Sequence, residues 1–103
     1  LAREALHQGG SITLTAGILS HRPWPGSAPV AMVNGALESF VRAAALDRDG
    51  HHRINAVSPP LIAETAKKRG MSEPGVPVRE VAKLYVEAIF GDMTGQVLTG
   101  SWG

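Results

Sequence analysis

The chain has 103 residues, a length that allows one small domain burying about 60–65% of its unfolded surface. Its composition, 44% hydrophobic and 18% charged, is globular, and a net charge of +1 gives no electrostatic footprint for nucleic acid or a membrane surface. The absence of cysteine excludes disulfides and thiolate chemistry and fits a cytoplasmic location, and no apolar run is long enough to predict a membrane span.

The first third of the chain predicts a helix end, a strand and a loop. Leu1 to Leu6 resemble the last turns of a helix closed by glycines, and because no methionine precedes them we expect a fragment, or a processed or incompletely recorded chain. Ser11–Thr15 is β-branched and apolar, as in a buried strand. Residues 17–28 contain two prolines and predict a loop, a common place for chemistry after a parallel strand.

The principal helix is expected from Pro29 to Asp47. Ser27 is placed to cap it, and Glu38 and Arg42 are spaced for a favourable i,i+4 pair. Small side chains on this helix would allow close approach, either of the sheet or of a second subunit. Its apolar residues recur every three or four positions and predict a core-facing stripe of Val33, Ala36, Leu37, Phe40, Val41, Ala44 and Ala45.

The second half of the chain repeats this alternation. A strand is expected at Arg53–Ser58, ended by two prolines, and a short helix at Leu61–Gly70. A last helix, Val78–Phe90, precedes a third strand at Gln96–Thr99. We expect the last helix to be closed by Gly91 and to bury a stripe of Val81, Ala82, Leu84, Tyr85, Ala88 and Ile89. Strand, helix, strand, helix, strand predicts an α/β fold with right-handed crossovers and a parallel sheet covered by helices.

Three segments, at residues 10–17, 53–59 and 94–98, resemble in order the second half of a short-chain dehydrogenase/reductase, and a fourth, Asn34–Phe40, resembles its long helix. The resemblance implies that residues 1–103 form a single partial domain. That domain would be the C-terminal half of a Rossmann-type doubly wound parallel sheet, with three strands and helices on both faces. It also implies an NAD(P)-dependent oxidoreductase acting on a small alcohol or ketone. The expected partners are the missing N-terminal half or a second copy in a homo-oligomer, with no nucleic acid and no membrane.

The catalytic positions of this family depart from its pattern here. The resemblance implies a serine at the end of the first strand, then a tyrosine and a lysine one turn apart in the long helix. Those positions hold Ala16 (or Gly17, with a one-residue gap), Val30 and Asn34. Valine has no proton to give and an amide does not titrate, so we expect a weak or inactive enzyme.

Weak candidates for a substitute proton donor are Thr15, Ser20 and His21, of which Thr15 should point to the opposite face of the sheet. The alternative function is a catalytically silent module for binding or oligomerisation.

The cofactor-binding positions survive in part. The resemblance implies that the residues after the second strand contact the nicotinamide, with Glu64 at the family's threonine position unless Thr65 serves instead. The implied set is Pro59, Pro60, Leu61, Ile62 and Thr65. No Gly-x-Gly-x-x-Gly turn occurs, so we expect NAD or NADP to bind the full-length protein but not this chain alone.

No metal site is predicted. His7, His21, His51 and His52 lack the spacing that puts two ligands on one helical face, and the last two are expected to be solvated in a turn. The turn at residues 47–50 lacks the further oxygen ligands of a calcium loop.

Overall fold

The computed structural model describes residues 10–47 and 52–100. The helix end expected at Leu1–Leu6 and most of the turn expected at 47–50 lie outside these ranges. The described elements, in chain order, are β1 (Ser11–Thr15), the 3₁₀ helix η1 (Ile18–Ser20), α2 (Ala28–Asp47), β2 (Arg53–Val57), α3 (Ala63–Lys68), α4 (Val78–Phe90) and β3 (Val97–Leu98).

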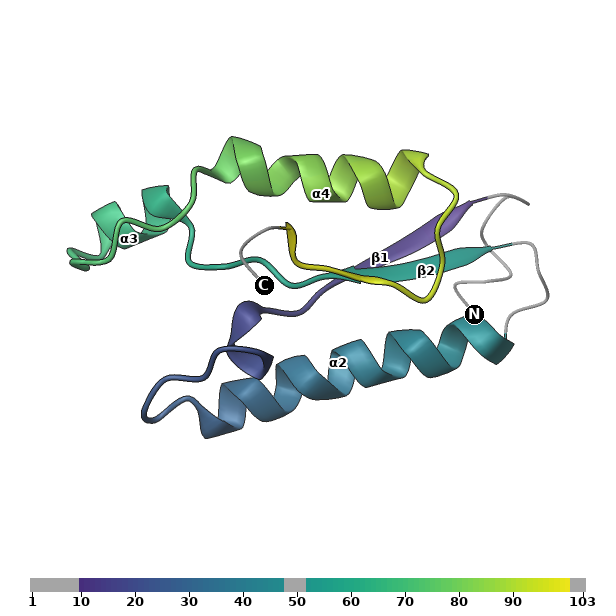
Figure 1. Ribbon diagram of the computed structural model, residues 1–103, viewed down its shortest axis with the longest axis horizontal. Coiled ribbons are helices and arrows are strands. Elements are labelled where there is room, and N and C mark those ends of the chain that lie inside the picture. Colours follow the sequence, from purple (N-terminus) through teal and green to yellow (C-terminus); the bar gives the residue numbers. More distant parts are fainter. Residues whose placement is uncertain (1–9, 48–51, 101–103) are drawn as a thin grey trace.

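The strands form one parallel sheet in the order β1-β2-β3. Ser11 pairs with Arg53 and Thr15 with Val57, so β1 and β2 end at the same level. Figure 1 shows α2 covering one face of the sheet and α4 the other. This confirms the predicted α/β fold. None of the helices described is long and apolar enough to cross a membrane.

The predicted boundaries agree with the structure to within two residues, and two short elements were missed. β2 and β3 are shorter than expected, because Ser58 and Thr99 follow the last paired residues. The loop after β1 contains the turn of η1. A single parallel β-bridge joins Ile62, just before α3, to Val76, which lies between α3 and α4. The segment that follows α3 therefore returns to lie beside the residue that precedes this helix.

The predicted core stripe of α2 is wrong in part. The face that meets the sheet is centred on Asn34, Glu38 and Val41, which are buried. Val33 and Phe40 are instead exposed, Phe40 at 57%. Apolar side chains thus occupy two faces of α2, and spacing alone could not show which face the sheet covers, since two polar residues lie on the buried one.

Three polar predictions around α2 are also corrected. Glu38 is turned into the protein and forms no pair with Arg42. The hydroxyl of Ser27 accepts the N–H of Trp24 at 3.0 Å, closing the turn before α2 instead of capping the helix. His52, expected to be solvated, is buried.

The stripe of α4 is confirmed at its centre, where Val81, Leu84 and Ala88 are buried, whereas Ala82 and Ile89 are exposed. The guanidinium of Arg53, at the start of β2, donates to the carbonyls of Ala88 and Ile89 at 2.9 and 2.7 Å. A cation at these terminal carbonyls also favours the helix dipole. The end of α4 is therefore fastened to the first residue of the central strand.

Gly91 ends α4, as expected, but for a steric reason. Its backbone is extended, and a Cβ there would lie 2.5 Å from the carbonyl oxygen of Glu87. Beyond it, fully buried Asn55 donates to the carbonyl of Met93 and accepts the N–H of Gln96, both at 3.0 Å. One side chain of β2 therefore sets the path of the loop that leads into β3.

The loop after β1 is held by the carboxylate of Glu38, which is 4% exposed. Ser20 donates to its Oε1 at 2.8 Å, and Nε2 of His21 lies 2.8 Å from its Oε2. The hydroxyl of Ser58 also donates to Oε2. One carboxylate therefore joins η1, α2 and the end of β2.

The environment of Glu38 favours its ionised form. Burial raises the pKa of this carboxyl, but hydrogen bonds from Ser58, His21 and Ser20, together with the charge of His21, outweigh burial and hold the pKa below its usual value. Because the folded pKa is the lower one, the stabilisation is complete above the unfolded pKa. It is lost as pH falls through the folded value.

In the protein as it is naturally expressed, Glu38→Gln is expected to lower the free energy of unfolding at pH 7 by about 1–3 kcal/mol, the range for a buried charge-assisted hydrogen-bond set. The deficit should start to shrink as the pH falls below about 4.5, where the carboxyl of the unfolded chain is protonated, and should be smallest once the folded carboxylate is protonated as well. Urea unfolding between pH 3 and pH 7 measures both quantities. Glu87→Gln, on the exposed side of α4, is the control and should change stability by less than about 0.5 kcal/mol. A deficit that stays constant across this range would contradict the role given to the charge.

Candidate functional site

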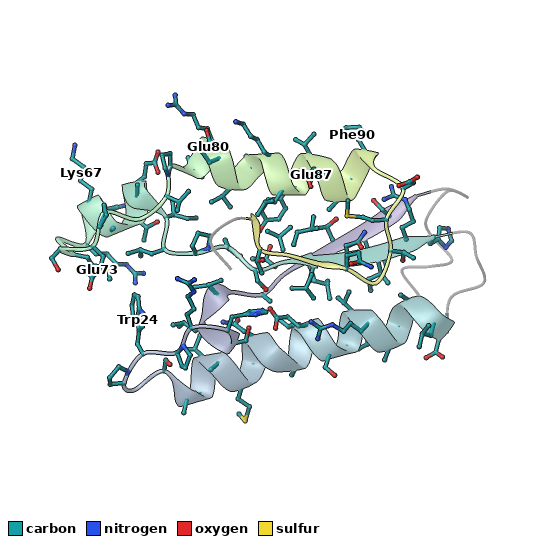
Figure 2. The ribbon with its side chains drawn as sticks, viewed as in Figure 1. Trp24, Lys67, Glu73, Glu80, Glu87 and Phe90 are labelled. Atoms are coloured by element: carbon teal, nitrogen blue, oxygen red, sulfur yellow. The ribbon has the colours of Figure 1, made fainter. Side chains whose placement is uncertain are left out.

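A pocket of about 200 Å³ lies at the carboxyl ends of β1 and β2, where ligands commonly bind in parallel α/β sheets. The loops after the two strands meet there, and the N–H of Ile18 donates to the carbonyl of Pro59 at 3.0 Å. Figure 2 shows Trp24 extending from the loop before α2 toward the segment that carries α3. The lining residues are Gly17, Ile18, Leu19, Trp24, Asn34, Pro59, Pro60 and Leu61.

The walls of this pocket are mainly apolar, and Asn34 supplies the one side-chain amide among the described lining residues. Asn34 is 9% exposed. A Cβ on Gly17 would lie 2.7 Å from its Nδ2, so the amide occupies space that any larger residue at position 17 would need. No titratable side chain belongs to this described lining.

The catalytic positions divide between the pocket and its surroundings. Ala16 continues the strand ladder, with its N–H donating to the carbonyl of Val57 at 2.8 Å, and it does not line the pocket, whereas Gly17 does. Val30, in the first turn of α2, is 51% exposed and outside the lining. Asn34, one turn later, is inside it.

The three weak candidates for a proton donor also lie outside the pocket lining. Thr15 points to the face covered by α4, where its hydroxyl lies 2.7 Å from the hydroxyl of Tyr85. Ser20 donates to Glu38 and to the carbonyl of Gly17, and His21 contacts Glu38. These two residues shape the loop that forms one wall of the pocket.

The expected cofactor-binding residues separate in the same way. Pro59, Pro60 and Leu61 line the pocket, whereas Ile62 forms the bridge to Val76 and Thr65 is exposed on α3. Glu64 accepts the N–H of Val78 at 3.0 Å and so caps the start of α4. The residue at the family's threonine position therefore has a structural partner.

Sequence reasoning missed Trp24, Ile18 and Leu19 as pocket residues and Glu38 as the residue that holds their loop. A tryptophan in a loop rich in proline and glycine was the available signal for the first. For Glu38, the signal was a carboxylate two residues from the centre of an apolar stripe. Within residues 10–47 and 52–100, no cluster of three or more His, Asp or Glu side chains could hold a metal ion.

Comparison with known proteins finds a family model described as enoyl-(acyl carrier protein) reductase, which matches residues 1–88. No curated protein matches the chain significantly. Among solved structures, the protein lin1944 from Listeria innocua is 35% identical over 93% of this chain and 50% of its own, with a TM-score of 0.86. A small-chain dehydrogenase is 32% identical over 97% of this chain and 50% of its own, with a TM-score of 0.79.

A further small-chain dehydrogenase, solved in complex with NADPH, is 27% identical over 99% of this chain and 54% of its own, with a TM-score of 0.80. The chain thus spans about half the length of the structures it resembles. The matched family model, the identity to solved relatives and the shared parallel α/β fold agree with the motifs of the sequence: this chain belongs to the short-chain dehydrogenase/reductase family.

Proposed function

We propose that this chain forms the C-terminal half of a Rossmann-type domain that binds NAD or NADP and acts, at most weakly, as an oxidoreductase on a small alcohol or ketone. The observation that carries the proposal is the convergence of Gly17, Asn34 and residues 59–61 on one pocket at the carboxyl ends of β1 and β2. These are positions at which the family's catalytic groups and nicotinamide contacts are expected.

The size of the pocket fits a part of a dinucleotide. Complete ligand sites usually measure about 300–1,000 Å³, so about 200 Å³ suits one flat ring and not the whole molecule. The relative solved with NADPH, which aligns over nearly the whole of this chain, supports the same cofactor class. Pro59, Pro60 and Leu61 would pack against the nicotinamide ring, which supplies or accepts a hydride when bound.

Proton transfer is the weak point of this active site. Reduction of a ketone needs a proton at the developing alkoxide, and general acid–base catalysis contributes typically ~10²–10⁴-fold in rate. Val30 and Asn34 have no proton to exchange near neutrality. Ser20 and His21 are engaged by Glu38 outside the pocket lining. Slow turnover, or none, is the expected behaviour.

In the full-length protein, Val30→Tyr with Asn34→Lys is expected to raise turnover of generic ketones by about 10²-fold or more, because the pair restores a proton donor and its activating cation one turn apart. NADPH oxidation over a broad ketone panel measures it. Val86→Tyr with Phe90→Lys places the same pair on the exposed side of α4 and should leave turnover unchanged. Normal cofactor binding without any gain in activity would show that the register, or the idea of a lost catalytic pair, is wrong.

A second candidate function is that of a silent binding or oligomerisation module, and the exposed face of α2 favours it. Met32, Val33 and Phe40 are more than half exposed there, and Ala36 and Ala43 are small and exposed beside them. We define these five residues as the outer face of α2. An exposed apolar surface of this kind on one helix is typical of a protein interface. We propose that the outer face of α2 pairs with its copy in a homo-oligomer.

Ala43→Glu is expected to weaken that oligomer, because it places a charge in a desolvated seam. Sedimentation at low micromolar protein should show a shift toward the smaller species. Ala82→Glu makes the same change on the exposed side of α4 and should leave the sedimentation coefficient as in the wild type. If Ala43→Glu behaves like this control, the outer face of α2 is not the interface.

The edge of the sheet leads to a further expectation. Among the described strands, β1 has a hydrogen-bonded neighbour on one side only. Unpaired strand edges recruit other chains, so we propose that a second polypeptide segment, from the rest of the protein or from a swapped copy, covers β1.

The isolated 103 residues are accordingly expected to be oligomeric, aggregated or unfolded. Light scattering and thermal unfolding at several protein concentrations test this. A monodisperse monomer with a two-state, concentration-independent transition would contradict it.

A further inference from the structure

The pocket at the ends of β1 and β2 combines uncharged walls with one buried amide. Trp24, Pro59 and Pro60 present ring surfaces, and Ile18, Leu19 and Leu61 complete the apolar part of the lining. A charged ligand group placed there would lose its hydration without gaining a counter-charge from the described lining residues. The walls therefore select for an uncharged group.

The amide of Asn34 provides the polar contact. The residue is about nine-tenths buried, faces the pocket, and forms no side-chain hydrogen bond with another residue in the part of the chain that the structure describes. An amide carries both donors and an acceptor, and no side-chain hydrogen bond between described residues occupies them, so they are available to a ligand in the pocket. A ligand group that can both accept and donate satisfies it best.

Gly17 is what makes room for that amide. A Cβ at position 17 would lie 2.7 Å from Nδ2 and 3.2 Å from Cγ of Asn34. Its backbone is extended, so a larger residue would meet no backbone strain but would have to displace the amide of Asn34. Gly17 and Asn34 therefore form a matched pair: the amide of Asn34 occupies the space that a side chain at position 17 would fill.

We propose that the Gly17–Asn34 pair is a specificity-determining subsite for a carbonyl or carboxamide carried on a flat, uncharged ring. Asn34 hydrogen-bonds the carbonyl group, and Trp24 and the two prolines pack against the ring. This chemistry has two sources, the carboxamide of the reduced, uncharged nicotinamide ring or the carbonyl of a substrate. The inference rests on the proposed function only for the first source.

The test uses the full-length protein and two probes of nearly equal shape, 4-fluorobenzamide and 4-fluorobenzoate, titrated by ¹⁹F NMR. We expect the neutral amide to bind at least about tenfold more tightly than the anion, which is about 1.4 kcal/mol. Asn34→Leu keeps the approximate volume and removes the amide. It should weaken 4-fluorobenzamide about five- to tenfold, the value of one or two neutral hydrogen bonds.

A second variant keeps the amide of Asn34 and changes only its position. Gly17→Ala should displace Asn34 and weaken 4-fluorobenzamide to a similar degree. Gly35→Ala is its matched control, because a Cβ there meets no atom within 4 Å, and its affinity should equal that of the wild type. Circular dichroism confirms that each variant is folded, and either position-17 or position-34 variant suffices for the test.

Repeating the titration with saturating NADPH separates the two sources. Displacement of 4-fluorobenzamide by NADPH, with weaker NADPH binding in Asn34→Leu, assigns the subsite to the cofactor. Simultaneous binding of both assigns it to the substrate. Probe binding without any NADPH binding would sink the proposed cofactor function and leave the subsite standing.

The subsite itself is overturned by equal affinities for the amide and the anion. It is equally overturned if folded Asn34→Leu or Gly17→Ala binds 4-fluorobenzamide within about twofold of the wild type.

Discussion

The position of the pocket depends on one buried carboxylate. Glu38 comes from the middle of α2, yet its partners are Ser20 and His21 from the loop after β1 and Ser58 from the end of β2. Two of the three elements it joins contribute the walls of the pocket, and the third contributes Asn34. A buried carboxylate without these donors would be strongly destabilising, so the loop must close over it for the helix to pack on the sheet. The contacts that hold α2 on the sheet are therefore the same contacts that shape the site.

The central strand organises the opposite side in the same way. Arg53 at its start holds the end of α4, and Asn55 in its interior sets the loop before β3. Beyond its end, Ser58 reaches Glu38. Because β2 lies between β1 and β3, the five residues of this strand and Ser58, which follows them, hold parts of the helices on both faces of the sheet. Asn55 in this strand and Ser58 just beyond it are fully buried, and each of them fastens a connection.

The sequence was sufficient for the elements and their order, and insufficient for the environment of single side chains. Alternation of periodic segments with proline and glycine predicted the strands and helices to within a few residues. Spacing could not tell that Phe40 is exposed while Glu38 is buried, because the partners of Glu38 lie 17 to 20 residues away along the chain. For the site, the family resemblance pointed to Asn34 and residues 59–61, which line the pocket. Trp24 lines it too, but it lies in an irregular loop whose path cannot be inferred from the periodicity of the sequence.

The close approach of Asn34 to residue 17 also makes the residue types at these two positions depend on each other. Any side chain at position 17, a serine included, would have to displace the amide of Asn34, because its Cβ would fall 2.7 Å from the present position of the amide nitrogen. A residue larger than glycine at position 17 therefore requires a new side-chain conformation, or a different residue, at position 34. Glu64 adds a second barrier, since replacing it by threonine would remove the cap of α4. The residues at positions 17 and 64 are therefore tied to their surroundings by packing: a replacement at either one changes a contact on which another element depends.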